Sequence, residues 1–311
     1  MKTVLITGGS GLVGQRLTQL LMDKGYKVIW LSRYARTKGP IYRYKWDYRN
    51  GVIDKEALHN ADYIIHLAGE SIGAKSWSSD NKRTIVDSRV KTAKLIFDAL
   101  QEIGKKPEAF ISASAVGYYG LDVSDKIYTE DDIIDGNDFL STTCQKWEAM
   151  SYRISNKLNI RTVILRTGVV LSPHSEAFKK MMLPVKLGVG SPLGRGNQFL
   201  SWIHIDDLCD MYIKAIEDVD MQGVYNAVAP EYVTNANFMR RLAKAMRRPF
   251  FMPRIPSFVM RMVMGEAADL VLGGSRVSSD KIIKTGFKFK YPTVDEAIMT
   301  TLSAIKSDIE Q

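Results

Sequence analysis

Residues 4–14 read VLITGGSGLVG, a short β-branched run followed by glycines spaced three apart. Apolar residues recur from Leu12 onward with helical spacing, so the stretch predicts a strand, a glycine turn and a helix. There Gly8 allows a tight turn, Gly11 lets the backbone approach a pyrophosphate, and Gly14 permits close packing of helix on strand. Free N–H groups at the start of the helix would face the anion. A glycine triplet alone also fits an ordinary turn, but its position between strand and helix favours a dinucleotide site. That site comprises Gly8, Ser10, Gly11, Leu12, Val13 and Gly14.

The segments after this turn continue the alternation of strand and helix. The helix ends at Gly25, and residues 27–31 form a second buried strand that completes a βαβ unit. Later apolar runs predict strands over residues 63–67, 109–111 and 162–165 and helices over residues 81–103 and 139–156. This alternation predicts an α/β fold, a Rossmann-type doubly wound parallel sheet with helices on both faces.

The sequence pattern changes after Arg166. Gly- and Pro-rich loops lead to an apolar run over residues 199–205, a helix that begins at Asp206 or Asp207, and a last core strand over residues 223–227. The rest is mainly helical. We expect two units: residues 1–170 with about 200–230 as the nucleotide-binding Rossmann domain, and residues 171–199 with 231–311 as a smaller, mostly helical lobe that binds substrate as a lid.

Composition narrows the class of protein. The 311 residues are 45% hydrophobic and carry a net charge of +9, typical of a globular protein that attracts phosphate-bearing ligands. Cys144 and Cys209 form no CxxC or metal-ligand spacing, so we expect a reducing, cytoplasmic setting without disulfides or a metal. The N-terminal apolar run is too short for a signal peptide, and residues 255–274 carry three charges, so we expect no membrane span.

The end of the second strand indicates which dinucleotide is bound. A carboxylate there would bind the ribose 2′-OH of NAD, but this sequence has Ser32 and Arg33, followed by Arg36 and Lys38. A guanidinium can bind a 2′-phosphate through charge-assisted hydrogen bonds, so we expect NADP(H). The alternative is that Arg33 is a solvated surface charge.

Further motifs follow the glycine turn in a fixed order along almost the whole chain. They are WD at 46–47, HLAGE at 66–70, DSRV at 87–90, SAVGYYG at 114–120, WE at 147–148, RTGVVL at 166–171, WIHIDD at 202–207, YNAVAP at 225–230 and GF at 286–287. With these motifs the chain resembles the short-chain dehydrogenase/reductase superfamily. It is more closely similar to the atypical extended members, the "epimerase family" NADP-binding proteins with a distinctive C-terminal segment.

The resemblance implies further cofactor contacts. It places a group of residues at strand ends against the cofactor, namely Leu67, Ala68, Gly69 and Val169. On the helix over residues 81–103, Thr84 and Ser88 share a face and Arg89 adds charge toward the phosphates. Ser88 stands where extended members usually have an Asn that contacts the cofactor, although a helical Ser equally often bonds its own backbone.

The sequence departs from the superfamily at the pair of residues that catalytic members use. Catalytic members carry a Tyr and, four residues later, a Lys, and the matching positions here are Leu140 and Cys144, which cannot do that work. Ser114 matches the Ser or Thr that hydrogen-bonds a substrate carbonyl, and Tyr118 is our candidate proton donor. Tyr119 is the alternative donor, and either tyrosine could instead pack the loop.

We assign no catalytic or nucleic-acid-binding role to His66, His204, Cys144 or the basic clusters. We interpret His66 and His204 as structural histidines and Cys144 as a small buried hydrophobe. Basic residues cluster with aromatic ones over residues 33–49 and 240–254, but a 2′-phosphate site with an exposed loop explains the first cluster and a solvated helix face the second. We therefore expect no functional nucleic-acid binding.

These observations predict an NADP(H)-dependent oxidoreductase that transfers hydride to or from a small carbonyl or alcohol substrate. Two alternatives stay open: a non-catalytic module that responds to NADP(H), which the missing Tyr and Lys favour, and a nucleotide-sugar epimerase, which only the family resemblance suggests. The sequence is compatible with a homodimer and does not determine the oligomeric state.

Overall fold

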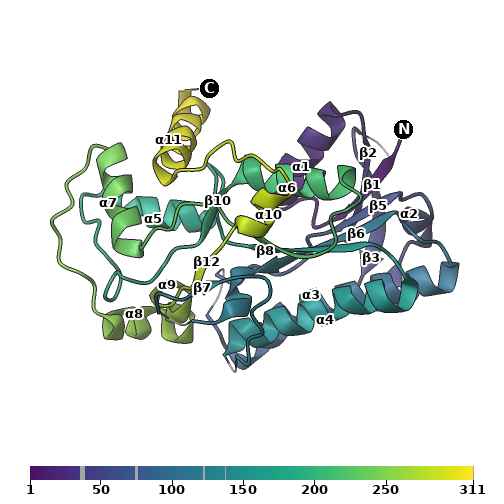
Figure 1. Ribbon diagram of the computed structural model, residues 1–311, viewed down its shortest axis with the longest axis horizontal. Helices are drawn as coiled ribbons and strands as arrows, with labels where there is room; N and C mark the ends of the chain where they lie inside the picture. The colour runs from purple at the N-terminus through teal and green to yellow at the C-terminus, as the bar shows by residue number, and fades with distance from the viewer. Residues whose placement is uncertain (36–38, 74–75, 122, 137, 311) are drawn as a thin grey trace.

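The computed structural model describes residues 1–35, 39–73, 76–121, 123–136 and 138–310. Arg36 and Lys38, which belong to the predicted 2′-phosphate site, lie outside the described residues. Within the described chain a large sheet separates two layers of helices, and a mostly helical lobe adjoins one end of it (Figure 1).

The predicted parallel sheet is confirmed. In the described residues it has eight strands in the order β11-β8-β6-β5-β1-β2-β3-β4, and the β3–β4 pair is the antiparallel one. The strands are β1 (Thr3–Thr7), β2 (Lys27–Ser32), β3 (Tyr42–Asp47), β4 (Val52–Ile53), β5 (Tyr63–His66), β6 (Ala109–Ala115), β8 (Thr162–Thr167) and β11 (Gly223–Ala227). The chain runs from β1 toward one edge and then returns to β5 on the other side of β1, so a crevice opens at the carboxyl ends of these central strands.

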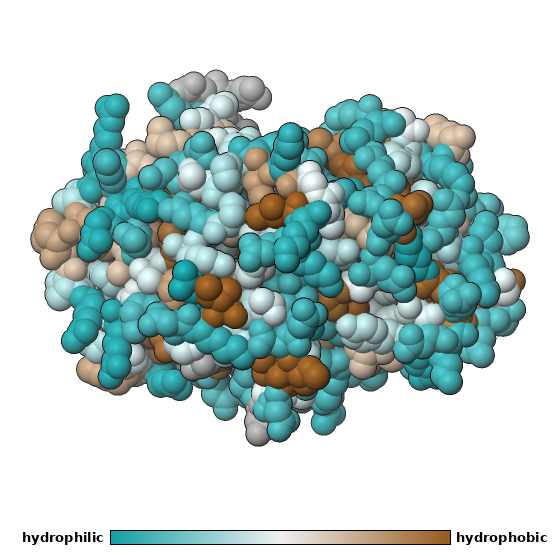
Figure 2. Space-filling model, in the orientation of Figure 1, coloured by the Kyte–Doolittle hydropathy of each residue, from teal (hydrophilic) through white to brown (hydrophobic). Residues whose placement is uncertain are grey.

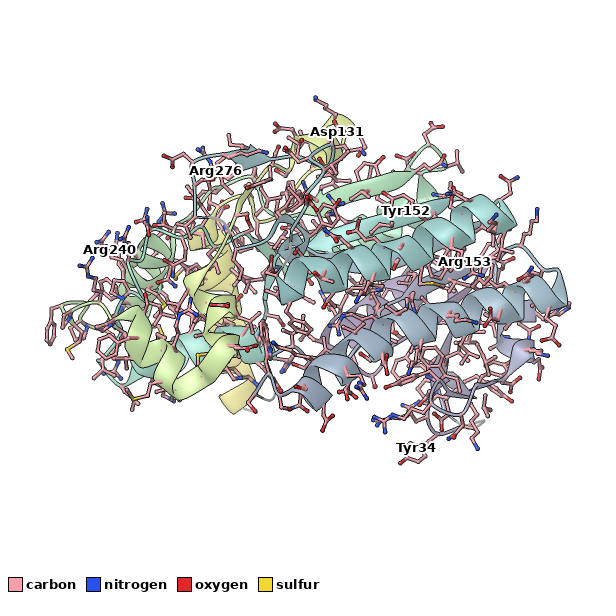
Figure 3. All side chains as sticks on the ribbon, turned by 90° about the horizontal axis from the view of Figure 1, so that it is seen from below. Tyr34, Asp131, Tyr152, Arg153, Arg240 and Arg276 are labelled. Carbon is pink, nitrogen blue, oxygen red and sulfur yellow. The ribbon has the colours of Figure 1, made fainter. Side chains whose placement is uncertain are left out.

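Helices cover both faces of this sheet, as predicted. Val4 and Ile6 face the layer of α1 (Leu12–Asp23), α6 (Ile205–Glu217) and α10 (Asp280–Lys284), while Leu5 faces the opposite layer. That layer contains α2 (Lys55–His59), α3 (Ser79–Ile103) and α4 (Phe139–Leu158). Figure 3 shows α3 and α4 side by side, and the guanidinium of Arg153 on α4 stacks over Phe97 of α3 at 4.5 Å.

β3 is the longest of the strands that the sequence did not predict. Residues 42–47 were assigned to an exposed loop within the first basic cluster, but they form β3, which pairs in parallel with β2. Tyr44 and Trp46 bury one face of the strand, while Lys45 on the other face is exposed. Alternating charged and aromatic residues therefore formed a half-buried strand.

The remaining elements form the C-terminal lobe and its connections. The short strands pair as β10 with β9 and β12 with β7. These strands and the other helices are β7 (Ile127–Tyr128), β9 (Val169–Leu171), β10 (Trp202–His204), β12 (Arg276–Val277), η1 (Val116–Tyr119), η2 (Gly265–Ala268), α5 (Glu176–Lys186), α7 (Asn235–Ala245), α8 (Ser257–Met264), α9 (Asp269–Leu272) and α11 (Val294–Glu310). A separate core joins α5, α7 and α11 around Phe178, Phe238 and Ile298.

The surface is mostly hydrophilic, with small separate hydrophobic areas on the face that Figure 2 shows. No described helix combines the length and the apolar character needed to cross a membrane. Within the described chain no group of three His, Cys, Asp or Glu side chains is arranged to hold a metal ion. Cys144 and Cys209 are both free and buried.

Candidate functional site

The glycine turn, residues 8–14, lies at the central crevice, and the protein itself requires glycine at both ends of it. Gly8 has φ of +72°, and a Cβ there would lie 2.9 Å from the backbone carbon of Leu67. A Cβ on Gly14 would lie 2.5 Å from the carbonyl oxygen of Gly8. At Gly11, by contrast, the nearest atom would be 3.3 Å away, and both Gly11 and Ser10 are exposed. Gly11 therefore keeps backbone open to the outside, as close approach of a ligand requires.

The first turn of α1 presents backbone donors to the crevice. Gly11 precedes the helix without a side-chain cap, and its own N–H donates to the carbonyl of Gly8 at 3.0 Å. No described residue accepts a hydrogen bond from the N–H groups of Leu12 or Val13. At the start of α4, in contrast, Asp138 accepts from two such N–H groups at 2.8 and 3.0 Å. Unpaired donors and the positive end of the helix dipole make the start of α1 fit a pyrophosphate.

The end of β2 supplies positive charge beside this turn. Arg33 is exposed and forms no ion pair with a described residue, while the Ser32 hydroxyl accepts from a backbone N–H two residues later at 3.4 Å. Sequence reasoning missed Gly9, where a Cβ would lie 2.4 Å from the ring of Trp30, and Arg43, whose guanidinium stacks on that ring at 4.8 Å. Recognising β3 would have revealed Arg43 as a neighbour of β2.

Leu67 and Ala68 follow β5 directly and border the crevice. The N–H of Ala68 donates to the hydroxyl of Thr7, which lies 2.8 Å from Nδ1 of buried His66. The Thr92 hydroxyl donates to backbone carbonyls of its own helix, so Nε2 of His66, 3.3 Å away, carries the ring proton and donates to it. Burial lowers the pKa of His66 to about 4. The structural role predicted for this histidine is confirmed.

The loop after β5 is tied to α3 through Ser88. Its hydroxyl accepts from the N–H of Glu70 and donates to the carbonyl of Ile85, both at 2.9 Å. The hydroxyl thus bonds its own helix, the alternative that the sequence left open, and also holds the loop that contains Gly69. The Thr84 hydroxyl donates to its own helix at 2.9 Å.

Arg89 lies behind this loop and is buried between α3 and α4. Its Cζ would lie 3.1 Å from a Cβ on Gly69, and its guanidinium is 5.0 Å from the ring of Trp147. A hydrogen bond from Nη1 to the carbonyl of Ile85, at 2.9 Å, fixes the side chain.

The positions of the missing Tyr and Lys face the loop after β6. Leu140 and Cys144 are both buried, 3.3 and 3.8 Å from the place a Cβ on Gly117 would take. Burial raises the pKa of the Cys144 thiol to about 12, although the charge of Arg89 acts in the opposite direction. The interpretation of Cys144 as a buried hydrophobe is confirmed, and neither residue exchanges a proton at neutral pH.

Ser114 belongs to a buried ion-pair network. Its hydroxyl donates to Oε1 of Glu148 at 2.6 Å. Arg166 donates to both carboxylate oxygens of Glu148, at 2.9 and 2.8 Å. The one hydroxyl proton of Ser114 is therefore directed to Glu148 and away from the crevice, which leaves its oxygen able to accept but not to donate.

The two tyrosines of the loop after β6 differ in their surroundings. The Tyr119 hydroxyl accepts from Arg166 at 3.0 Å and donates to Oδ1 of Asn226 at 2.7 Å, and burial raises its pKa. Tyr119 thus packs the loop, one of the alternatives that the sequence left open. Tyr118 is half-buried, its ring 3.4 Å from the Arg166 guanidinium, and its hydroxyl has no hydrogen-bond partner in the described part of the chain.

A cavity of about 880 Å³ adjoins the glycine turn on the side of α1, α6 and α11. Polar side chains from both lobes line it, and Arg16 donates to Asp206 within it at 2.7 Å. Sequence reasoning missed most of this lining, which comprises Gly11, Leu12, Gln15, Arg16, Ser71, Ser172, Pro173, His174, Glu176, His204, Ile205, Asp206, Thr300, Thr301 and Ala304.

His204 and Val169 lie on the paired strands β10 and β9. Nδ1 of His204 accepts from the N–H of Asp206 at 3.3 Å, its ring lies 3.9 Å from that of Tyr291, and burial lowers its pKa to about 4. His204 is thus a helix cap, as its structural interpretation required. Val169 pairs with Trp202 and is half-buried.

The chain matches the NAD dependent epimerase/dehydratase family over residues 4–228. It belongs to this family. Residues 255–300 also match DUF1731, a domain of unknown function, which agrees with the distinctive C-terminal segment that the sequence suggested.

Several members of the family resemble the chain along nearly its whole length. The epimerase family protein SDR39U1 of Mus musculus is 37% identical, covering 95% of this chain and 98% of its own. Epimerase family protein YfhF of Bacillus subtilis is 35% identical, covering 98% and 99%. A crystal structure of human SDR39U1 (isoform 2) with NADPH superposes with a TM-score of 0.86 at 33% identity and covers 97% of this chain and 99% of the human one.

Within the family fold, the predicted cofactor and catalytic residues, apart from Val169 on β9, fall into three groups. The glycine turn, the end of β2 and the residues after β5 meet at the central crevice. Thr84, Ser88 and Arg89 lie on α3, and Ser88 and Arg89 reach the loop after β5. Ser114 and Tyr118 lie on β6 and the loop after it, across the sheet toward β8.

Proposed function

We propose that this protein binds NADP(H) across the central crevice. The observation that carries the proposal is the first turn of α1, where the N–H groups of Leu12 and Val13 have no acceptor among the described residues. In the proposed complex these groups hold the pyrophosphate, and Arg33 holds the 2′-phosphate. The human relative that was crystallised with NADPH supports this choice of cofactor.

The activity we propose is oxidation or reduction of a small carbonyl or alcohol. When bound, the nicotinamide would supply hydride transfer. Tyr118 is the proposed proton donor, because its hydroxyl has no hydrogen-bond partner in the described chain and its half-buried ring is held 3.4 Å from the Arg166 guanidinium. The cavity of about 880 Å³ beside the glycine turn is lined by Gly11 and Leu12, and by neither Ser114 nor Tyr118, so it offers space on the cofactor side of the proposed site. Because the Ser114 hydroxyl already donates to Glu148, Ser114 would accept, rather than donate, a hydrogen bond from a substrate beside Tyr118.

Titration with NADPH and NADH tests the cofactor assignment. Arg33→Ala should weaken NADPH binding about tenfold to a hundredfold, because it removes a charge-assisted bond to the 2′-phosphate, and should leave NADH binding within about twofold. Exposed Arg248, on the C-terminal lobe, gives the matched control Arg248→Ala, which should change neither affinity. Equal losses for both cofactors in Arg33→Ala would refute the 2′-phosphate role.

The second candidate function is a non-catalytic module whose partner binding follows the redox state of NADP(H). Burial of Leu140 and Cys144 favours it, because neither exchanges a proton. Nucleotide-sugar epimerisation has less support, since it needs the same missing pair. Incubation of the NADPH complex with carbonyl compounds, followed by nicotinamide absorbance, separates the candidates: oxidation that Tyr118→Phe slows supports the oxidoreductase, and no oxidation by any compound supports the module.

We also propose a reducing, cytoplasmic setting for the protein, because both Cys144 and Cys209 are free thiols and buried.

A further inference from the structure

Two arginines are buried at similar depth beside the sheet, and their surroundings differ. Arg166 is 2% exposed and is paired with Glu148 through two hydrogen bonds. Arg89 is 7% exposed and forms no ion pair with any described carboxylate. Its Nε is buried without a hydrogen-bond partner, and its Nη1 donates to one backbone carbonyl.

An unpaired buried cation is costly, because removal from water is not offset by an opposite charge or by hydrogen bonds. The pKa directions agree with this difference. Burial lowers the pKa of Arg89, whereas at Arg166 the lowering by burial is outweighed by the bonds to Glu148, which raise the pKa. The contact with the ring of Trp147, 5.0 Å away, holds the Arg89 guanidinium in place without neutralising it. A charge held in this way is arranged for a ligand that the chain itself does not supply.

The position of Arg89 indicates which part of a ligand it meets. Its Cζ lies behind Gly69, on the loop that follows β5 at the crevice. Cys144 is close enough for each group to shift the pKa of the other. Cys144 stands where the superfamily places the Lys that holds the ribose, and Trp147, the stacking partner of Arg89, is one helical turn further along α4.

We propose that Arg89 replaces this missing lysine, reaching from α3 to hydrogen-bond the ribose of the nicotinamide half of NADP(H). The proposal rests on the NADP(H) binding proposed above. It assigns Arg89 a part of the cofactor different from the phosphates that the sequence suggested. A lysine at position 144 would repel the Arg89 guanidinium. The neutral thiol of Cys144 does not, and it leaves space for the guanidinium.

Three ligands of increasing length test the assignment by calorimetric titration. They are adenosine 2′-phosphate 5′-diphosphate, which ends at the second phosphate, 2′-phospho-ADP-ribose, which adds the second ribose, and NADPH. Arg89→Met should bind the first ligand as the parent protein does and the other two about tenfold to a hundredfold more weakly. An equal loss for all three ligands would assign Arg89 to the phosphates or to general support of the site, and would overturn the proposal.

Two controls separate this result from other failures. Arg33→Ala should weaken all three ligands, and if the parent protein binds none of them, the proposed NADP(H) site itself fails. Arg153→Met removes another arginine stacked across the contact of α3 with α4, and should leave all three affinities unchanged (Figure 3).

A structural role for Arg89 has a different signature. Replacing an unpaired buried charge by methionine should leave the urea midpoint of the ligand-free protein unchanged or raise it. A lower midpoint with unchanged affinities would overturn the proposal. Should Arg89→Met not fold, Arg89→Lys keeps the charge without the planar fork, and should still bind the two ribose-containing ligands more weakly. Adding Cys144→Lys to Arg89→Met should restore part of the NADPH affinity.

Discussion

Two walls of the crevice use their polar groups in opposite ways. At the start of α1 and at Arg89, donors lack acceptors among the described residues. Where β6 and β8 face α4, Ser114 and Arg166 on the strands both donate hydrogen bonds to Glu148 on the helix. The first wall is arranged to receive a ligand, and the second is already satisfied without one.

The difference shows how a binding site and a structural network can be told apart when both are buried, polar and near the same strand ends. Completed hydrogen bonds stabilise one arrangement and hold its protons, so such groups give up a proton only by breaking the network. Binding of an anion to unpaired donors is favourable, because it forms hydrogen bonds that the protein alone does not make. Proton transfer from the second wall is therefore restricted to Tyr118, whose hydroxyl lies outside the network in the described chain.

Removing the Glu148 carboxylate should produce the largest loss of stability. Glu148→Ala leaves Arg166 buried without its carboxylate, so the free energy of unfolding should fall by about 3 to 5 kcal/mol. Denaturation in urea measures the change. Asp87→Ala, which breaks the partly exposed Asp87–Lys91 pair at 2.6 Å, should cost less than about 1 kcal/mol. Equal losses in the two variants would show that the Glu148 network contributes no more than a surface pair.

Two glycines of the turn should separate folding from binding. Gly14→Ala places a methyl group 2.5 Å from the Gly8 carbonyl oxygen, so it should lower the free energy of unfolding by about 2 to 3 kcal/mol. Gly11→Ala meets that oxygen at 3.3 Å and should change stability little, yet weaken NADPH binding. Urea denaturation and calorimetry on both variants provide the comparison. If Gly11→Ala bound NADPH like the parent, the ligand would not approach at Gly11.

The sequence predicted the first wall better than the second for a physical reason. The positive φ of Gly8 and the close approach of Gly14 to the Gly8 carbonyl are both local to the turn, so spacing alone indicates these two glycines. The bond from Ser114 to Glu148 joins residues 34 positions apart, and no local pattern indicates where a serine proton points. β3 was missed because its charged residues resemble a surface loop until β2 lies beside it. Arg89 was placed near the cofactor by resemblance, but its lack of a partner is visible only in the packed structure.

Lowering the pH should reduce the free energy of unfolding through His66. Its pKa of about 4 in the folded state lies below the ordinary value of 6.5, so the unfolded chain binds more protons between these values and stability falls as pH drops below 6.5. At pH 5 this contribution is a loss of about 2 kcal/mol relative to pH 8. His204 acts in the same direction, and Asp207, whose folded pKa is raised to about 6, acts in the opposite one.

Comparing variants isolates the His66 contribution from the other two groups. The unfolding free energy of His66→Gln should decline less than that of the parent between pH 8 and pH 5, by about 2 kcal/mol. His59→Gln, at an exposed histidine of α2, should keep the parent's pH dependence. A parent-like slope in His66→Gln would mean that this ring is not held neutral.

The smallest expected effect concerns the thiol between the two walls. Arg89 lowers the pKa of Cys144, but burial dominates and raises it to about 12, so the thiol is protonated at pH 8. Iodoacetamide should leave Cys144 unmodified in the native protein and alkylate it in urea, as peptide mass spectrometry would show. Rapid native alkylation would require a thiolate near Arg89. The guanidinium would then be paired by this chain's own sulfur, and the contrast between an unpaired wall and a satisfied one would no longer hold at that point.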